Sequence, residues 1–242
     1  MLQAALWGGI AGSSLFIGAI LGIYRFVSNK VSAFVMAFGT GVLVGAATFE
    51  LLTDAVKEGG ILYPSIGFLL GATIFIIAEF LIMRKGGHER KRSKTSPAGH
   101  SGLAIFIGTI IDAIPESVII GVSLLENQSV SWLIVIAIFI SNFPEGLSSS
   151  IGMKKDGYSS KRILFLWLVV LILSSLSSFL GYVLIDISSQ WLITSIGAFA
   201  AGGIIAMVSS TMLPEAFEEG GPIVGFLSAL GLLSSLILTY YG

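Results

Sequence analysis

The sequence contains no cysteine among its 242 residues. Thiolate metal ligands, disulfides and thiol redox chemistry are therefore excluded, and any metal site must use oxygen or imidazole ligands. Charge is also scarce: 11% of the residues are Asp, Glu, Lys or Arg, against about a quarter in a soluble domain. With 55% hydrophobic residues and a mean hydropathy of +0.95, the chain has too little polar surface for water. We expect an integral membrane protein surrounded by lipid.

Eight apolar runs, each long enough to cross a bilayer, are separated by polar clusters. They lie near residues 4–26, 31–56, 61–83, 101–125, 130–152, 163–185, 191–217 and 222–241. The first run has no basic residue before it, so we do not interpret it as a cleaved signal peptide. The sequence predicts an all-α membrane protein of eight transmembrane helices that form one transmembrane domain, residues 1–242.

The positive charges predict the orientation of these helices. Loops after the first, third and fifth runs hold twelve of the thirteen lysines and arginines, and Lys57 is the exception. The twelve are Arg25, Lys30, Arg84, Lys85, Arg90, Lys91, Arg92, Lys94, Lys154, Lys155, Lys161 and Arg162. Since short cytoplasmic loops are enriched in Lys and Arg, we expect the basic loop 84–99 in the cytoplasm and both termini extracytoplasmic.

A weak internal repeat relates residues 38–60 to residues 199–221 at an offset of 161. The matched pairs are Phe38 and Phe199, Gly41 and Gly202, Leu52 and Leu213, Asp54 and Glu215, Ala55 and Ala216, Glu58 and Glu219, and the two Gly-Gly pairs. The copies fall in spans 2 and 7, which cross the membrane in opposite directions. Inverted repeats are typical of secondary transporters, whose substrate site lies between the halves. Chance similarity between apolar helices is the alternative.

Acidic residues gather toward the ends of both repeat copies, at opposite membrane faces. The expected outer group is Glu50, Asp54 and Glu58, and the expected inner group is Glu215, Glu218 and Glu219. Acids at both mouths of one pathway would attract cations to it. We predict that the two groups line the entrance and the exit, although acids at helix ends are often only solvated surface.

Spans 4 and 5 each carry a Pro-Glu pair about half-way along, within Asp112–Glu116 and Ser141–Glu145. A charged carboxylate at the bilayer centre costs at least about 2.5–3.5 kcal/mol, so it is expected to face a polar interior. Asp112 shares a helix face with Glu116, and Ser141 shares one with Glu145. Because no lysine or arginine falls within either span, we expect a metal ion or protons to balance the acids.

These residues predict a metal site of oxygen ligands: Asp112, Glu116, Ser141, Asn142 and Glu145. Each proline also displaces the carbonyl four residues earlier, at Ile111 and Ile140, which adds oxygen atoms beside the carboxylates. The alternative is a pair of proline-kinked helices whose acids are protonated and hydrogen-bonded.

The segment Asn142–Gly146 resembles the His-Asn-x-Pro-Glu-Gly signature of the ZIP (Zrt/Irt-like) family of metal transporters, over essentially the whole chain. Pro115-Glu116 is similar to the same signature in span 4, and Met212–Ala216 resembles the family's end of span 7. The resemblance implies a 3+2+3 arrangement and a secondary transporter that moves a divalent metal (Zn, Mn or Fe) toward the cytoplasm. It further implies that Glu116 and Glu145 form the core of the metal centre, with Asn142 as a ligand.

The chain departs from the family pattern at several ligand positions. Asp112 and Ala113 stand where span 4 usually has His-Asn, and Ser141 stands where span 5 has His or Gln. A glutamate usual in span 6 is replaced within Ser174–Ser178. The predicted spans therefore hold no histidine, which favours one site of oxygen ligands and shifts the expected preference from zinc toward Mn²⁺ or Fe²⁺.

Other functions are less well supported by the residues. An intramembrane serine protease lacks a histidine at depth, and an aspartyl protease lacks a second aspartate beside Asp112, so we do not expect an enzyme. A ZIP-like metal sensor without transport is the alternative that the altered ligands leave open. His88 and His100 could handle metal weakly in the basic loop.

The expected partners follow from the same reasoning. They are membrane lipid and the metal ion, with no organic cofactor and no nucleic acid. Small-residue helix faces would permit a homodimer. The expected location is the plasma membrane of a prokaryote.

Overall fold

A computed structural model describes residues 2–24, 27–84, 101–126, 130–186 and 190–241. For residues 82–84, 101–105, 111–112, 125–126, 184–186 and 190 it describes the backbone alone. The His88, His100 and loop 84–99 predictions fall largely outside the described residues. Throughout these ranges the chain is helical and contains no strand, which confirms the all-α class.

Eight helices in the described part are long and apolar enough to cross a membrane, as predicted. In chain order the spans are α1 (Leu2–Tyr24); α2 (Asn29–Gly45), η1 (Ala46–Leu52) and α3 (Thr53–Gly59) in series; α4 (Leu62–Arg84); α5 (Ser101–Glu126); α6 (Trp132–Lys155); α7 (Ser160–Asp186); α8 (Gln190–Met207), η3 (Val208–Met212) and α9 (Leu213–Gly220) in series; and α10 (Ile223–Tyr241). Their bounds differ from the predicted ones by a few residues because polar residues such as Ser28 and Ser131 cap the helices.

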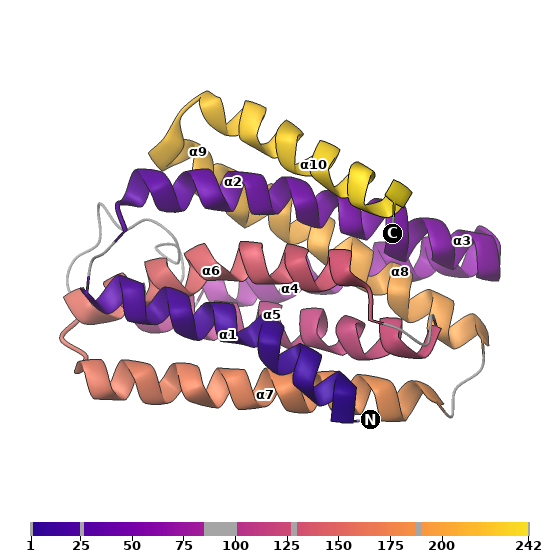
Figure 1. Ribbon diagram of the computed structural model, residues 1–242, viewed down its shortest axis with the longest axis horizontal. Coiled ribbons are helices and arrows are strands. Elements are labelled where there is room, and N and C mark those ends of the chain that lie inside the picture. Colours follow the sequence, from indigo (N-terminus) through magenta and orange to yellow (C-terminus); the bar gives the residue numbers. More distant parts are fainter. Residues whose placement is uncertain (1, 25–26, 85–100, 127–129, 187–189, 242) are drawn as a thin grey trace.

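Helix α6 lies inside the bundle and packs on α1, α2 and α5. Helix α7 packs outside α1 and α5, α4 packs on α8, and α10 packs on α2 (Figure 1). Within the most apolar window of each span, 69% of the residues are buried in α5 and 67% in α6, against 17% in α4 and in α10. The two helices that carry the Pro-Glu pairs are therefore, with the second span (Asn29–Gly59, also 67%), the ones most shielded from lipid.

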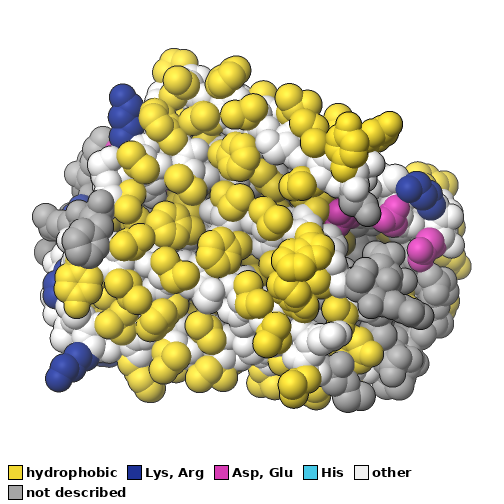
Figure 2. Space-filling view, viewed as in Figure 1, with side chains coloured by type: hydrophobic (Ala, Val, Ile, Leu, Met, Phe, Trp, Pro, Cys, Tyr) yellow, Lys and Arg dark blue, Asp and Glu magenta, His cyan; other side chains and the backbone are white. Residues whose placement is uncertain are grey.

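The two ends of the bundle differ in charge. Both termini lie at the same end, together with α3, as eight crossings require (Figure 1). Lysine and arginine side chains gather at the other end in Figure 2, and a broad band of hydrophobic side chains separates the ends. The described basic residues outside α3 and α4 lie in the terminal turns of α2, α6 and α7 at that basic end: Lys30, Lys154, Lys155, Lys161 and Arg162. This separation is the one that the loop charges predicted.

Close glycine contacts place the two repeat copies in matching environments. A Cβ atom on Gly202 would lie 1.9 Å from the Phe68 carbonyl oxygen, and one on Gly41 would lie 2.0 Å from the Ser228 carbonyl oxygen. The backbones of α8 and α4, and of α2 and α10, therefore touch at related positions. Because Gly41 and Gly202 are equivalent in the repeat, the similarity reflects structure rather than chance.

Both repeat helices also contain a π-helical segment, which the sequence did not predict. The segments are η1 (Ala46–Leu52) and η3 (Val208–Met212). The repeat offset of 161 carries η1 onto residues 207–213, so the two segments occupy related positions. Short π segments inside α-helices are frequent at functional sites.

Candidate metal centre and pathway

The predicted centre is built on two packed helices with internal prolines, Pro115 in α5 and Pro144 in α6. Glu116 is 2% exposed and Glu145 is 3% exposed, so both carboxyl groups are inside the protein. Glu116 also lines a pocket of about 130 Å³ between α4, α5 and α8. The two glutamates thus lie at depth in neighbouring helices, away from lipid and from bulk water.

Two further predicted ligands are buried on α6. Ser141 is fully buried and its hydroxyl donates to the Ile138 carbonyl at 3.1 Å, while Asn142 is 3% exposed. A donating hydroxyl keeps its oxygen lone pairs available, and the Asn142 amide supplies a carbonyl oxygen. The backbone of Asp112 lies in α5, four residues before Glu116, and its side chain lies outside the described part.

The side chains predicted to form this centre offer only oxygen atoms as ligands. Among the described side chains, no group of three or more His, Asp and Glu residues could hold a metal ion. The described part therefore offers two carboxylates, an amide oxygen and a hydroxyl, a combination suited to harder divalent cations. Asp112 as a third carboxylate stays a prediction.

A vestibule opens at the end of the bundle that holds the termini. This pocket of about 810 Å³ lies between η1 and α3, the end of α5, the start of α6 and the end of α10. Glu50, Asp54 and Lys57 are among the lining residues, with Ser123 on the α5 wall. Of the three predicted entrance acids, Glu50 and Asp54 share this pocket. Glu58 is exposed on α3 and is not among the residues that line it.

Glu50 connects the vestibule to α6. Ser131 is the N-cap of α6 and accepts a hydrogen bond from the Ile134 amide at 3.1 Å. The same hydroxyl donates to Oε2 of Glu50. The carboxylate therefore lies at the N-terminus of α6, where the helix dipole favours negative charge.

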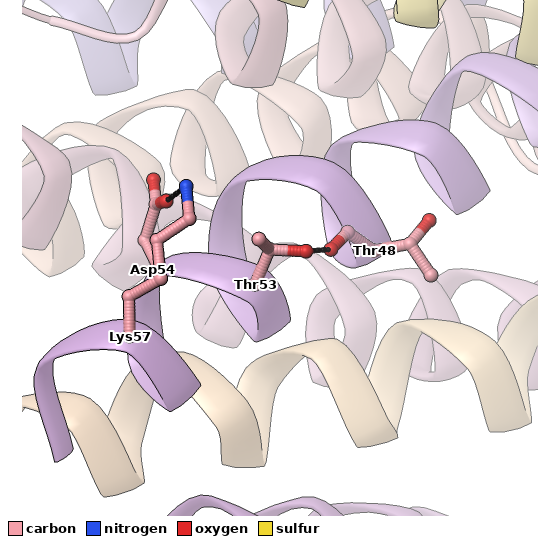
Figure 3. Close-up of polar contacts among 4 residues, drawn as sticks. All are labelled: Thr48, Thr53, Asp54 and Lys57. Carbon is pink, nitrogen blue, oxygen red and sulfur yellow. Dashed lines mark hydrogen bonds and ion pairs between the residues drawn. The ribbon is translucent and has the colours of Figure 1, made fainter. Parts of the chain in front are cut away.

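The hydroxyl of Thr53, the first residue of α3, donates a hydrogen bond to a backbone carbonyl of the π segment η1. Figure 3 shows the Thr53 hydroxyl donating to the Thr48 carbonyl five residues earlier, at 2.6 Å. In the same view Lys57 Nζ lies 3.0 Å from Asp54 Oδ1. The two side chains of this ion pair are 69% and 46% exposed, so the pair adds little stability and leaves Asp54 at the rim of the vestibule.

The inner acids lie on α9, at the basic end. Glu215 is half-buried and its Oε1 accepts a hydrogen bond from Ser148 Oγ at 3.1 Å. Ser148 is three residues beyond Glu145 on the same face of α6. Glu215 is therefore positioned about one helical turn from the predicted centre. Glu218 is exposed and Glu219 is half-buried farther along α9.

Comparison with known proteins agrees with this arrangement. The family model described as "ZIP Zinc transporter" matches residues 83–240, more than half of the chain. The chain belongs to the ZIP zinc transporter family. The membership in the ZIP family that the sequence predicted is thereby confirmed.

Individual relatives cover most of this ZIP chain. The zinc transporter ZupT of Enterobacter sp. is 26% identical over 246 residues, covering 95% of the chain and 94% of that protein. ZupT of Salmonella newport is 27% identical over 251 residues, covering 96% of each. An Arabidopsis thaliana protein provisionally named a zinc transporter is 26% identical over 208 residues, 85% of the chain. The aligned region is 33% of that plant protein.

Two serines of this ZIP chain were missed in the sequence. Ser131 and Ser148 each bind one of the predicted mouth acids. An N-cap serine just before an apolar run is a recognisable signal for Ser131. No sequence pattern indicates Ser148, because its partner Glu215 is 67 residues away and is brought near only by the fold.

Proposed function

We propose that this protein is a secondary transporter that carries a divalent metal cation through the α5–α6 centre toward the cytoplasm. The observation that carries the proposal is the burial of Glu116 and Glu145 on two packed, proline-containing helices of a ZIP-family chain. Carboxylates at such depth are expected to serve a pathway rather than to stabilise the fold. The family and the ZupT relatives, which are named zinc transporters, support a metal substrate.

The proposed path begins at the vestibule. Glu50 and Asp54 attract a cation into this wide pocket, where negative charge raises the local cation concentration. The centre then binds it with Glu116, Glu145, Asn142, Ser141 and Asp112. Glu215, about one turn beyond Glu145, receives it at the inner mouth, and Glu218 and Glu219 lead it to the cytoplasm.

The proposed orientation in the membrane rests on the charges at the two ends of the bundle. Twelve of the thirteen basic residues lie in the loops of one side, and such a bias marks the cytoplasmic side. The vestibule then faces outward and both termini are extracytoplasmic. The proposed location is the plasma membrane of a prokaryote, as the bacterial ZupT relatives suggest.

Oxygen ligands lead us to propose Mn²⁺ or Fe²⁺ as a better substrate than zinc. Imidazole and thiolate suit zinc, whereas carboxylate and carbonyl oxygens suit harder ions. The spans hold no cysteine and no histidine, since both histidines lie at 88 and 100. The rival proposal, a metal sensor without transport, rests on the same altered ligands at Asp112, Ala113 and Ser141.

Binding and flux, measured on one preparation, separate these proposals. Purified protein in liposomes is assayed for metal uptake, and the same protein in detergent is assayed for metal binding. A transporter gives saturable uptake that Glu116→Gln and Glu145→Gln abolish. A sensor gives binding that depends on both glutamates with no uptake for any ion.

A further inference from the structure

Helix α6 is held by two serine–carboxylate hydrogen bonds, one to each copy of the inverted repeat. Ser131 donates to Glu50, which lies in η1 of the first copy. Ser148 donates to Glu215, which lies in α9 of the second copy. The two contacts use the same chemistry, and both copies of the repeat take part.

The two bonds lie near opposite membrane faces. Ser131 and Ser148 are 17 positions apart, which corresponds to about 25 Å along a helix axis. That distance is close to the thickness of the hydrocarbon core, about 30 Å. Glu145 lies between the two serines along α6. One bond therefore lies on the vestibule side of the proposed centre and the other on the cytoplasmic side.

Each bond is suited to respond to a cation. A hydroxyl that donates to a carboxylate makes a charge-assisted hydrogen bond, and such bonds are stronger where water is scarce. A metal cation that binds the same carboxylate competes with the serine for its oxygen atoms. The cation at either mouth would therefore weaken the contact that holds α6 at that mouth.

Both acids lie in or next to a π segment. Glu50 lies inside the π segment η1, and η3 ends at Met212, three residues before Glu215. Short π segments inside α-helices are frequent at functional sites. A change of shape confined to such a segment would move the acid while the rest of its helix stays packed.

We propose that Ser131 with Glu50, and Ser148 with Glu215, are two positioning pairs that hold α6 at the two mouths, each separating when the proposed centre opens toward its own mouth. This inference rests on the proposed transport function. The serines act through the acids and the position of α6, and they need not touch the metal. Separation of the outer pair favours the state open to the vestibule, and separation of the inner pair favours the state open to the cytoplasm.

The absence of cysteine from the chain allows a direct test with one thiol reporter. Ser123 lines the vestibule. Its hydroxyl donates to the Ile120 carbonyl of the same helix at 3.0 Å. The Ser123 side chain is only 3% exposed although the vestibule is open in the structure. A Ser123→Cys reporter is labelled on cells with a membrane-impermeant thiosulfonate, and the labelling rate measures how often the path from the vestibule toward the centre opens. Ser131→Gly breaks the outer pair, because glycine still serves as an N-cap, and Ser148→Ala breaks the inner pair.

The two variants are expected to change the labelling rate in opposite directions. Losing one such bond shifts a two-state equilibrium about three- to tenfold, so Ser131→Gly raises the rate and Ser148→Ala lowers it. Ser131→Thr and Ser148→Thr keep the hydroxyl and restore the parent rate. Ser234→Ala, which removes a hydroxyl bonded within α10, leaves the rate unchanged.

Several results would overturn the inference. A general loosening of the fold would move the rate in the same direction for both serine variants, and that result contradicts paired contacts with opposite effects. Unchanged rates contradict it as well. Glu215→Ala breaks the inner pair from its other side and must lower the rate as Ser148→Ala does; a rise would refute the pairing. Labelling needs no metal flux. If uptake assays show that the chain carries no metal, the proposed transport function is wrong, and the labelling rates still test whether the two serine–carboxylate pairs control access.

Discussion

Gly60 and Gly221 adopt the same left-handed backbone, with φ of 69° and 68°. They are the C-caps of α3 and α9, which lie at opposite ends of the bundle (Figure 1). Gly60 ends the first repeat helix before α4, and Gly221 ends the second before α10. The repeat offset of 161 relates the two positions. The same turn is therefore built twice in opposite membrane orientations, which is what an inverted repeat requires.

Replacing Gly60 with alanine tests this turn. A Cβ on Gly60 would have nothing within 4 Å, so the expected penalty comes from the backbone alone, about 1–3 kcal/mol for a glycine-only conformation. Thermal unfolding in detergent should show a lower midpoint for Gly60→Ala and for Gly221→Ala. Gly225→Ala is the control, because its Cβ also has open space and its backbone is helical. Equal midpoints for all three variants would contradict the assignment.

The contact between α4 and α8 gives a second stability prediction. A Cβ on Gly71 would lie 1.8 Å from the Phe199 carbonyl oxygen, so the two backbones must separate to admit it. Overpacking of this kind costs about 1–3 kcal/mol. Gly71→Ala is expected to lower the unfolding midpoint clearly below that of Gly225→Ala. Gly231→Ala should behave alike, since its Cβ would lie 2.1 Å from the carbonyl oxygen of Phe38, the repeat partner of Phe199.

Much of the fold follows from the sequence because lipid imposes a simple pattern. Eight apolar runs and the loop charges predicted the number of spans and the separation of charge between the ends. The paired glycines and acids at an offset of 161 predicted the inverted repeat. The π segments escaped prediction because residues 46–52 and 208–212 look like ordinary helix in an apolar run. The Thr53 hydroxyl bonds the Thr48 carbonyl of η1, a contact that no periodicity in the sequence indicates.

The candidate site could be predicted from the sequence only in part. Glu116 and Glu145 stand out because acids are rare in apolar runs, and both are buried as expected. The vestibule and the two serine–carboxylate pairs could not be predicted, because they join residues far apart in the chain. Ser131 is 81 residues from Glu50. Sequence spacing along one helix gives no information on such contacts.

The proposed orientation predicts one-sided thiol labelling. Glu58 and Lys155 are both exposed, on opposite ends of the bundle. Single variants Glu58→Cys and Lys155→Cys, made in the cysteine-free chain, are treated on intact cells with an impermeant maleimide. Glu58→Cys should be labelled at once, and Lys155→Cys only after the cells are permeabilised. The reverse pattern would contradict the proposed orientation and would place the vestibule on the cytoplasmic side.

The oxygen ligand set predicts the order of metal preference. In competition uptake by the reconstituted protein, Mn²⁺ or Fe²⁺ should inhibit Zn²⁺ entry at lower concentration than Zn²⁺ inhibits theirs, because carboxylate and amide oxygens favour harder ions. Cd²⁺, a softer ion, should compete poorly. Equal uptake of zinc and manganese would contradict an oxygen-only centre.

The most direct test of the account is Mn²⁺ uptake by proteoliposomes that contain the wild-type protein or its Glu145→Gln variant. The substitution keeps the size of the buried side chain and removes the charge that the centre requires. Asp156→Asn, at the C-cap of α6 and outside the proposed pathway, serves as a matched control for a generic loss of an acid. The account predicts saturable uptake by the wild type, little change in Asp156→Asn and none above protein-free liposomes in Glu145→Gln. Undiminished uptake by Glu145→Gln would contradict a metal pathway through α5 and α6.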